Sequence, residues 1–371
     1  MTLSRILVVD DEPGIIRSVE RVLCHEYEVA SSRSPRDAIG LAEAFKPALA
    51  ILDVQMPDMD GFELMERLQA IDPELKVIFM TGSIHELDAK LIRSIRKDAF
   101  YFLQKPFDRE VLLTLVAKCL ELKRLELENR KHLERIEKEL AEARAFQHAL
   151  LPPQQAQLGG ITVFARYLPC SELAGDFYDY APVGPDQATL LVADVSGHGA
   201  SAAMLTGIVK SAFHSSSSEG YEPVRVVERV SNGIRAFGDR HFISLICVRI
   251  GKGSVEFVNA GHPPGILVQY ESSTALLEAT GPIISPALSK SSWQSHTISV
   301  QSKARLLLFS DGIIEAESDA GDYGLERLVR QVTGNTGRGD DLLDDILKSI
   351  RQFAAGRPIQ DDLTLVAADV S

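Results

Sequence analysis

The sequence predicts two folded domains: an α/β domain with a five-stranded, parallel, doubly wound sheet, and an α+β domain in which helices flank a β-sandwich. The chain has 371 residues, enough for two domains of ordinary size. Up to residue 120, short apolar runs alternate with helix-length amphipathic stretches, whereas beyond residue 150 strand-like runs come in groups with paired helical segments. Strict alternation is typical of a parallel sheet, and grouping is typical of an α+β fold.

The first predicted domain, residues 1–120, rests on five apolar runs of strand length. They are Ile6–Val9, Tyr27–Ala30, Leu49–Leu52, Val77–Met80 and Phe100–Leu103. In a parallel, doubly wound sheet, ligands bind in the crevice outside the carboxyl ends of the strands. The polar residues that follow these runs are therefore the first candidates for a functional site.

A stretch without glycine or proline follows, between Asp108 and Leu151. Its apolar residues recur at spacings of three and four, and include Leu112, Leu115, Cys119, Leu122, Leu133, Ile136, Leu140, Ala143 and Leu150. We therefore predict a helical linker over residues 108–150 that continues the last helix of the first domain. The spacing favours a dimerising coil, in which one continuous heptad frame places Glu126 and Asn129 at the seam as a polar interruption. A single solvated helix packed on a neighbouring domain is the alternative.

Residues 151–371 form the second predicted domain. The linker helix should end at Leu151-Pro152-Pro153, because proline removes a helix hydrogen bond and clashes with the preceding turn. Seven β-rich runs follow: Ile161–Tyr167, Thr189–Ala193, Phe242–Ile250, Val255–Asn259, Gly265–Gln269, Arg305–Phe309 and Leu363–Ala368. Helices are predicted near residues 199–213 and 222–237, and one further helical stretch over roughly 324–355.

Composition and charge argue against several classes of protein. The net charge is −13 and no block of Lys or Arg occurs, so nucleic-acid binding is not expected. The four cysteines lie far apart without a CxxC pair, which indicates neither a zinc site nor a disulfide framework. The N-terminal apolar run is too short for a signal peptide, and no run of 18 apolar residues occurs. These features predict a cytoplasmic protein without a membrane partner.

Five polar residues stand at the ends of predicted strands on one edge of the first sheet. Asp10 and Asp11 follow the first strand, Asp53 the third, Thr81 the fourth and Lys105 the fifth. Three carboxylates gathered there would repel one another unless a hard cation such as Mg²⁺ lies among them. The lysine and the hydroxyl complete a cradle for a transferred phosphoryl group. One aspartate alone would be an ordinary turn or cap residue, but five matching positions indicate a site.

Residues 1–120 resemble the response-regulator receiver family. The motifs that carry the resemblance are VVDDEPG at 8–14, LDVQMPDMDG at 52–61, MTG at 80–82 and LQKPF at 103–107. The resemblance implies that a cognate histidine kinase phosphorylates Asp53. The resemblance also implies a Mg²⁺ ion held by Asp11, Asp53 and the main-chain carbonyl of Gln55, with Asp10 close by. Thr81 and Lys105 would contact the phosphoryl oxygens, and Phe102 would be the switch aromatic.

The second half of the chain carries acidic residues beside apolar strands. They are Asp194 in LLVADVSGHG, Asp311 in LLLFSDGIIEA, Asp361 and Asp362 in IQDDLTLVAAD, and Asp176 and Asp179 in AGDFYDY. Converging acids without histidine or thiolate partners suit Mg²⁺ or Mn²⁺ and not zinc. Two such ions can generate hydroxide and stabilise an in-line displacement at phosphorus. Each acid alone could be a turn residue or a cap. His198 could bind a metal, but packing in its Gly-x-Gly loop is the favoured role.

Residues 151–371 resemble the SpoIIE/RsbU-type branch of the metal-dependent (PPM) protein phosphatases. The shared stretches are LLPP (150–153), GDFYDY (175–180), ADVSGHG (193–199), NAGHPP (259–264), FSDGIIEA (309–316), YGLERL (323–328) and DDLTLV (361–366). The resemblance implies a β-sandwich flanked by helices, with two Mn²⁺ or Mg²⁺ ions. It also implies hydrolysis of phosphoserine or phosphothreonine on a small regulatory protein. The expected substrate is a phosphorylated anti-sigma factor antagonist of the STAS type, in a partner-switching pathway.

The same resemblance assigns the metal ligands. They are Asp194 as a bridge between both ions, the carbonyl of Val195 on the second ion, Asp311 and Asp361 on the first, and Asp176 on the second through water. Asp194, Asp311 and Asp361 are thus the expected catalytic residues, and Asp362 is expected behind the ligands. The sequence departs from the family at Ala174, where a glycine often stands, which bears on backbone room but removes no ligand.

Two classes of function fit this architecture. The first is an enzyme, a receiver-gated protein serine/threonine phosphatase. The second is a non-catalytic adaptor similar to RssB, in which a decayed phosphatase domain binds a regulatory protein or a sigma factor. Because a decayed site should have lost metal-binding acids, and Asp194, Asp311 and Asp361 are all present, the sequence favours the enzyme. Charge and motifs disfavour a DNA-binding output, and a homodimer through the linker is the further partner we expect.

Overall fold

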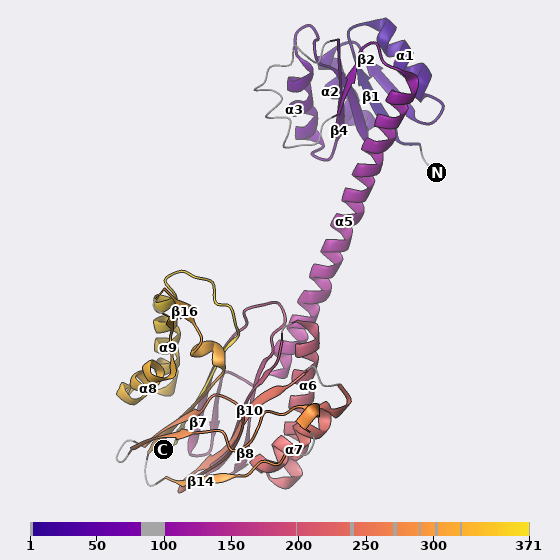
Figure 1. Cartoon of the computed structure of the whole chain (residues 1–371). Helices are drawn as coiled ribbons and strands as arrows, with labels where there is room; N and C mark the ends of the chain where they lie inside the picture. Colours follow the sequence, from indigo (N-terminus) through magenta and orange to yellow (C-terminus); the bar gives the residue numbers. More distant parts are fainter. Residues whose placement is uncertain are drawn as a thin grey trace. The chain divides into compact units, whose positions relative to one another are not determined.

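The structure is a computed structural model that describes residues 3–82, 101–197, 199–237, 241–269, 273–288, 291–300, 303–319 and 321–370. The chain separates into two compact units, Met1–Ile136 and Glu137–Ser371. Each unit has its own hydrophobic cores. The predicted fold classes are confirmed, with an α/β unit first and a helix-flanked β-sandwich second (Figure 1). The limits that we gave to the domains, at residues 108, 120 and 150, stay a prediction.

The first unit is a parallel sheet between two layers of helices. The strands are β1 (Arg5–Val9), β2 (Glu28–Ser32), β3 (Leu49–Asp53), β4 (Lys76–Thr81) and β5 (Tyr101–Gln104), in the order β2-β1-β3-β4-β5. The described helices are α1 (Pro13–Leu23), α2 (Pro35–Phe45), α3 (Gly61–Ile71) and α5 (Arg109–Leu150). One core lies between the sheet, α1 and α5, and the other between the sheet, α2 and α3. The helix-length segment expected between the last two strands falls on residues 83–100, outside the described residues.

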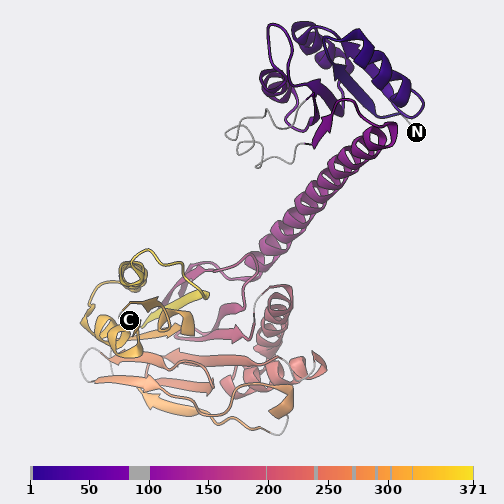
Figure 2. The same cartoon turned by 45° about the horizontal axis from the view of Figure 1, so that its top comes forward.

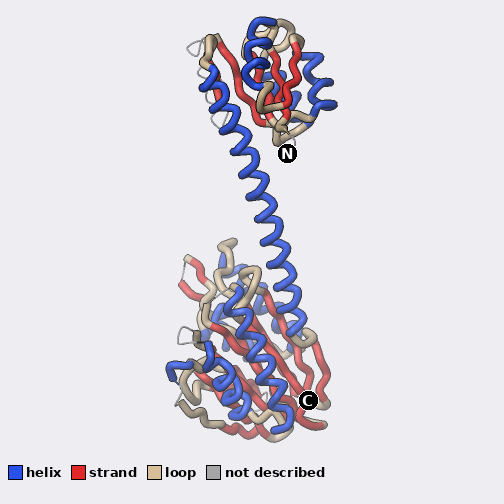
Figure 3. The backbone as a smooth tube through the Cα atoms, turned by 90° about the vertical axis from the view of Figure 1, so that its right-hand side faces the viewer, coloured by secondary structure: helices blue, strands red, loops and turns tan. Residues whose placement is uncertain are grey.

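The long helix α5 covers the predicted linker stretch and is drawn as one continuous helix in Figure 3. Its first turns pack Leu112, Val116 and Cys119 into the core of the first unit. Further along, Leu133 and Ile136 are 53% and 51% exposed. The helix over residues 108–150 therefore agrees with the periodicity, and its exposed apolar face is compatible with pairing, which stays a prediction.

The second unit is built on two antiparallel sheets packed face to face. The first sheet has the order β14-β11-β10-β9-β8 and the second β13-β12-β15-β18-β7-β6. Their strands are β6 (Gln155–Leu158), β7 (Ile161–Leu168), β8 (Asp176–Gly184), β9 (Gln187–Val195), β10 (Ile243–Gly251), β11 (Ser254–Ala260), β12 (Gly265–Gln269), β13 (Ser273–Leu277), β14 (His296–Ser299), β15 (Ala304–Phe309) and β18 (Leu363–Val370). A short hairpin, β16 (Glu317–Ser318) and β17 (Gly321–Asp322), lies apart from them.

Helices cover the outer face of each sheet, as Figure 1 and Figure 2 show. The first sheet packs against α6 (Ala200–Ser215) and α7 (Pro223–Ile234), and the second against α8 (Leu325–Gly334) and α9 (Gly339–Ala354). Since both faces of both sheets are buried, alternate residues of one strand enter different cores. Leu190 and Val192 of β9 lie between the sheets, whereas Leu191 and Ala193 lie beneath the helices.

Several elements differ from the sequence prediction: one helical stretch is divided, and the short strands β6, β13, β14, β16 and β17 as well as the longer β8 were not predicted. The helical stretch expected over 324–355 is two helices, α8 and α9, because Asn335 has extended dihedrals that end the first one. The guanidinium of Arg305 donates to the carbonyl of Gly337 in the break at 2.6 Å, which holds it against β15. Strand β8 was not predicted, because its first six residues, DFYDYA, are all buried and show no alternation of polar and apolar residues. Among the described helices, none has the length and apolar character needed to cross a membrane.

Candidate functional site

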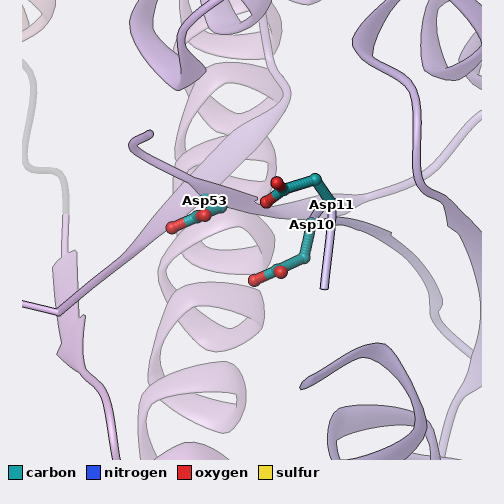
Figure 4. Close-up of side chains that lie close together, drawn as sticks. All are labelled: Asp10, Asp11 and Asp53. Carbon is teal, nitrogen blue, oxygen red and sulfur yellow. The ribbon is translucent and has the colours of Figure 1, made fainter. Parts of the chain in front are cut away.

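Three carboxylates meet at the carboxyl edge of the first sheet. Strands β1 and β3 are direct neighbours, so Asp10 and Asp11 after β1 face Asp53 at the end of β3. Oxygen atoms of the three side chains lie within 4.8 Å of one another (Figure 4). Asp10 is fully buried and Asp53 nearly so. Such a cluster of buried anions is costly without a cation among them, so its donor set fits a hard divalent ion.

Lys105 closes this site from the loop after β5. Its Nζ lies 2.6 Å from Oδ2 of Asp10 and 3.1 Å from Oδ1 of Asp53. Burial raises the pKa of Asp53 above its usual value, and the lysine opposes that rise. Burial by itself would lower the pKa of Lys105, but its hydrogen bonds to Asp10 and Asp53 raise it. One lysine therefore faces three acids, which leaves a net negative charge for a cation to offset.

The remaining receiver candidates lie around the same edge. The carbonyl of Thr81, the last residue of β4, accepts a 2.8 Å hydrogen bond from the main chain of Lys105. The ring of Phe102 stacks on that of Phe79 with centroids 5.6 Å apart, and Gln55 is exposed in the loop after β3. Asp10, Asp11, Gln55 and Lys105 thus follow strands at one edge of the sheet, Asp53 and Thr81 end strands there, and Phe102 lies within β5.

The acids of the second unit come from both sheets of the sandwich. Asp176 begins β8 and is the cross-strand partner of Asp194 near the end of β9. In the other sheet, Asp311 follows β15 in the turn η5 (Asp311–Ile313), and Asp361 precedes β18, the neighbour of β15. The hydroxyl of Thr364 donates to Asp176 across the two sheets. The four acids therefore gather where the ends of four strands meet.

The acids of this cluster act on one another electrostatically. Burial, together with the negative charges of Asp311 and Asp361, raises the pKa of Asp194 to about 7. Burial and the charge of Asp361 raise the pKa of Asp311 to about 6. Asp176 is fully buried and its pKa lies well above the usual range, since burial and Asp194 both disfavour its charge. Mutual repulsion in an all-oxygen cluster is relieved by divalent ions, so these residues fit a Mg²⁺ or Mn²⁺ centre.

Asp362 ties the two sheets together behind this cluster. Its Oδ1 accepts from the main-chain N–H of Cys170 at 2.8 Å, and its Oδ2 from that of Gly175 at 2.9 Å. Its own N–H donates to Oδ1 of Asp361 at 2.8 Å. The position of Asp362 is thus compatible with the supporting role that we expect for it.

Two glycines permit the close approach of main chain at the site. A Cβ atom on Gly175 would lie 2.5 Å from the carbonyl oxygen of Val195 and 3.4 Å from Oδ1 of Asp194. A Cβ atom on Gly312 would lie 2.3 Å from the carbonyl oxygen of Asp362. The glycines of the GDFYDY and SDG motifs are therefore required by packing at the acid cluster. The alanine that precedes the first of them, Ala174, is accommodated as a buried residue.

Two arginines differ in their distance from the acids. The guanidinium of Arg166 is held by Asp340 at 2.7 Å and Asp344 at 2.8 Å, two residues outside the acid cluster. Arg357 lines a cavity of about 260 Å³ that also contains Asp361 and Glu315. Arg357 and Glu315 were not among the residues predicted from the sequence. Glu315 lies within the FSDGIIEA motif, so the motif could have indicated it as a site residue. Arg357 belongs to no motif, so nothing in the sequence indicated it.

A buried histidine lies one strand away from Asp194. Ser244 on β10 is the cross-strand partner of Asp194, and its Oγ lies 2.7 Å from Nδ1 of His262. His262 is buried, and burial lowers its pKa to about 3. It is therefore a neutral, structural group at ordinary pH. His198, the other histidine considered above, lies outside the described residues.

Comparison with known families identifies both units. Residues 184–371, just over half of the chain, match the family of stage II sporulation protein E (SpoIIE), and residues 6–117 match the response regulator receiver domain. The chain belongs to the SpoIIE family of PP2C-type phosphatase domains, and it carries a receiver domain ahead of that domain. Both resemblances inferred from the motifs are confirmed.

Individual relatives agree with this assignment. The chain is 27% identical over 217 residues to phosphoserine phosphatase RsbP of Bacillus subtilis (strain 168), which covers 57% of this chain and 52% of RsbP. It is 34% identical over 124 residues to sporulation initiation phosphotransferase F of the same organism, covering 33% of this chain and 98% of that protein. The chain thus spans about half the length of RsbP.

Among solved structures, the SiaA-PP2C domain of Pseudomonas aeruginosa has the same fold. The TM-score is 0.56 at 18% identity, and the match covers 64% of this chain and 97% of that domain. This likeness concerns the fold alone. The second unit is therefore a PP2C-like sandwich joined to a receiver domain.

Proposed function

We propose that this chain is a metal-dependent protein serine/threonine phosphatase controlled by phosphorylation of its receiver domain. The observation that carries the proposal is the convergence of Asp176, Asp194, Asp311 and Asp361 from strand ends of two different sheets. Asp176 is buried and Asp194 and Asp311 are half-buried, and neighbouring acids contribute to the raised pKa of each of the three, which is costly to a fold unless these groups have a function. The similarity to RsbP, whose name describes a phosphoserine phosphatase, supports the same activity.

Each acid has a proposed role at the metal centre. Asp194 would serve both of two Mn²⁺ or Mg²⁺ ions, Asp311 and Asp361 would hold the first, and the carbonyl of Val195 and Asp176, through water, would serve the second. Bound ions of this kind supply a nucleophilic hydroxide and offset the charge that develops on the phosphoryl oxygens. The chain itself holds the carboxylates at fixed positions.

Asp362 contributes to this rigidity without touching the phosphoryl group. Because it accepts hydrogen bonds from Cys170 and Gly175, it fixes the main chain that leads into β8 at Asp176. Fixed ligands need no reorganisation when charge develops in the transition state, which is where such centres gain most of their rate.

The proposed substrate is a phosphorylated anti-sigma factor antagonist of the STAS type, within a partner-switching pathway. The cavity beside Asp361 offers Arg357 and Ile359 to the residues around a phosphoserine or phosphothreonine. Arg357 is paired with Asp319, so a contact of this arginine with the phosphoprotein would exchange one ion pair for another.

The receiver is proposed to act as the switch. A cognate histidine kinase transfers a phosphoryl group to Asp53, with Mg²⁺ held by Asp11, Asp53 and the carbonyl of Gln55 beside Asp10. Lys105 and Thr81 then contact the phosphoryl oxygens, and Phe102 is the aromatic side chain that changes position when Asp53 is phosphorylated. The buried contacts of Lys105 with Asp10 and Asp53 support this assignment, because phosphorylation of Asp53 would alter both. Paired α5 helices would carry the signal between chains.

The decisive test is release of phosphate from a phosphorylated STAS-type antagonist with and without Mn²⁺, using the full chain. We expect turnover that requires the metal, and Asp194→Asn should lose nearly all of it together with bound metal. Full activity and unchanged metal content in that variant would refute the site. A wild-type chain that binds a sigma factor or regulatory protein tightly but releases no phosphate would favour the adaptor alternative.

A further inference from the structure

The last turn of α5 buries a glutamine among exposed neighbours. Gln147 is 7% exposed, whereas Phe146 before it is 69% exposed and His148 after it is also exposed. A buried side-chain amide is costly unless its donor and acceptor groups find partners. The contacts of Gln147 are therefore a specific feature of this helix end.

Both ends of the Gln147 amide hold one residue of the loop that precedes β8. Its Nε2 donates to the carbonyl of Ala174 at 2.8 Å, and its Oε1 accepts from the N–H of Ala174 at 3.2 Å. Nε2 also lies 3.4 Å from the hydroxyl of Thr206 on α6. Ala174 lies outside the paired strands, so this side chain takes the place of a strand partner for its main chain.

The residue held by Gln147 adjoins the proposed metal centre. Gly175 follows Ala174, and its carbonyl accepts from the N–H of Val195 at 3.2 Å. As shown above, Gly175 is so close to the carbonyl of Val195 and to Asp194 that a Cβ atom would not fit. Asp176 comes next. A small shift of Ala174 would therefore move the main chain that lies against three proposed metal ligands.

The same loop also leads to α6. The carbonyl of Leu173 accepts from the N–H of Gly199, the residue before the first turn of α6, at 3.2 Å. Gln147 thus contacts a loop that is hydrogen-bonded both to the end of β9 and to the start of α6. Two of its hydrogen bonds join α5 to this loop, and the third joins α5 to α6.

We propose that Gln147 is a positioning residue of the phosphatase metal centre. By holding Ala174, it keeps Gly175 and Asp176 against Asp194 and Val195, so that the last turn of α5 is part of the geometry that binds metal. This inference rests on the proposed metal-dependent phosphatase function. Residues that support metal ligands without touching the metal typically change metal affinity by about 10–100-fold when replaced.

The test compares Gln147→Leu with His148→Leu in the full chain. The first substitution removes the three hydrogen bonds at similar side-chain length, and the second places the same residue at an exposed position in the same turn. Mn²⁺ binding is measured by titration calorimetry without substrate, and kcat and KM are measured with the phosphorylated antagonist. We expect the Kd for Mn²⁺ to rise about 10–100-fold in Gln147→Leu and to stay unchanged in His148→Leu. Saturating Mn²⁺ should restore most of the kcat, with little change in KM.

If Gln147 served folding alone, its replacement would lower the melting temperature. The Kd for Mn²⁺, measured at a temperature well below the melting temperature, would not change. A folded Gln147→Leu chain that binds Mn²⁺ within twofold of wild type would therefore overturn the proposal. Should that variant fail to fold, Gln147→Met serves instead, because it keeps the length and flexibility of the side chain and removes both the amide donor and the amide acceptor. It should give a comparable rise in Kd, and an unchanged Kd would overturn the proposal equally. A wild-type chain that binds Mn²⁺ but hydrolyses no phosphoprotein would contradict the proposed function and not the role of Gln147.

Discussion

Replacement of Gly175 by alanine should disturb the proposed metal centre, because the added Cβ atom would come too close to main-chain oxygen atoms. The new Cβ atom would lie 2.5 Å from the carbonyl oxygen of Val195 and 3.1 Å from that of Gly197. To reach an ordinary contact of 3.4 Å, the main chain must move by roughly 0.9 Å. Both obstructing atoms belong to the backbone at the end of β9, so no flexible side chain can rotate away.

The displaced atoms include a proposed metal ligand, the carbonyl of Val195. A misplacement of about 1 Å at a reacting centre can cost about 100-fold in rate, and overpacking of this kind costs about 1–3 kcal/mol of stability. We therefore expect Gly175→Ala to remain folded, with kcat reduced on the order of 100-fold.

The assay is Mn²⁺-dependent release of phosphate from the phosphorylated antagonist, with circular dichroism to verify folding. Gly184→Ala is the matched control, because Gly184 ends the same strand, β8, and its added Cβ would meet nothing within 4 Å. Activity of Gly175→Ala within twofold of Gly184→Ala would refute the reasoning, since it would mean that the centre tolerates the movement.

Three further predictions concern the receiver, the linker and the sandwich. A small phosphodonor with Mg²⁺ should add one phosphoryl group to the wild-type chain and none to Asp53→Ala, as read by intact mass; equal labelling of both would exclude Asp53 as the acceptor. Beryllofluoride bound to the receiver should increase the mass seen by light scattering and change the phosphatase rate, through pairing of α5 at Leu133 and Ile136; a changed rate in a chain that stays monomeric would replace pairing by a change within one chain. Burial lowers the pKa of His262 from 6.5 to about 3. Below about pH 6.5 the unfolded chain therefore binds a proton at this histidine that the folded chain does not bind. The contribution of His262 to stability is complete above that pH and is lost as the pH falls toward 3. The stability difference between wild type and His262→Gln, from urea unfolding of the full chain, should therefore shrink by up to about 1.4 kcal/mol per pH unit over this window, and a constant difference would contradict the assignment.

The sequence by itself determined the class of both units, because their patterns are local. In the first unit, apolar runs of four or five residues mark the strands, and a parallel sheet brings the residues after them to one edge. Asp10, Asp53 and Lys105 could therefore be placed together before any coordinates were considered. The helix through residues 108–150 was equally accessible, since helix periodicity and the absence of glycine and proline depend only on neighbouring residues.

In the second unit, motifs located the acids but spacing could not show which of them meet. Asp176 and Asp194 belong to one sheet and Asp311 and Asp361 to the other, so their convergence depends on how two sheets pack. The same packing hid β8 from the sequence, because a strand buried on both faces loses the alternation that reveals strands.

The tertiary structure alone decided the roles of several polar residues. Arg166 is held by Asp340 and Asp344, some 175 positions away in the chain. Gln147 looks like any polar residue of a charged helix, and only the fold places Ala174 against it. Hydrogen bonds between distant segments leave no periodic trace in a sequence, since each partner satisfies a requirement that exists only once the chain has packed.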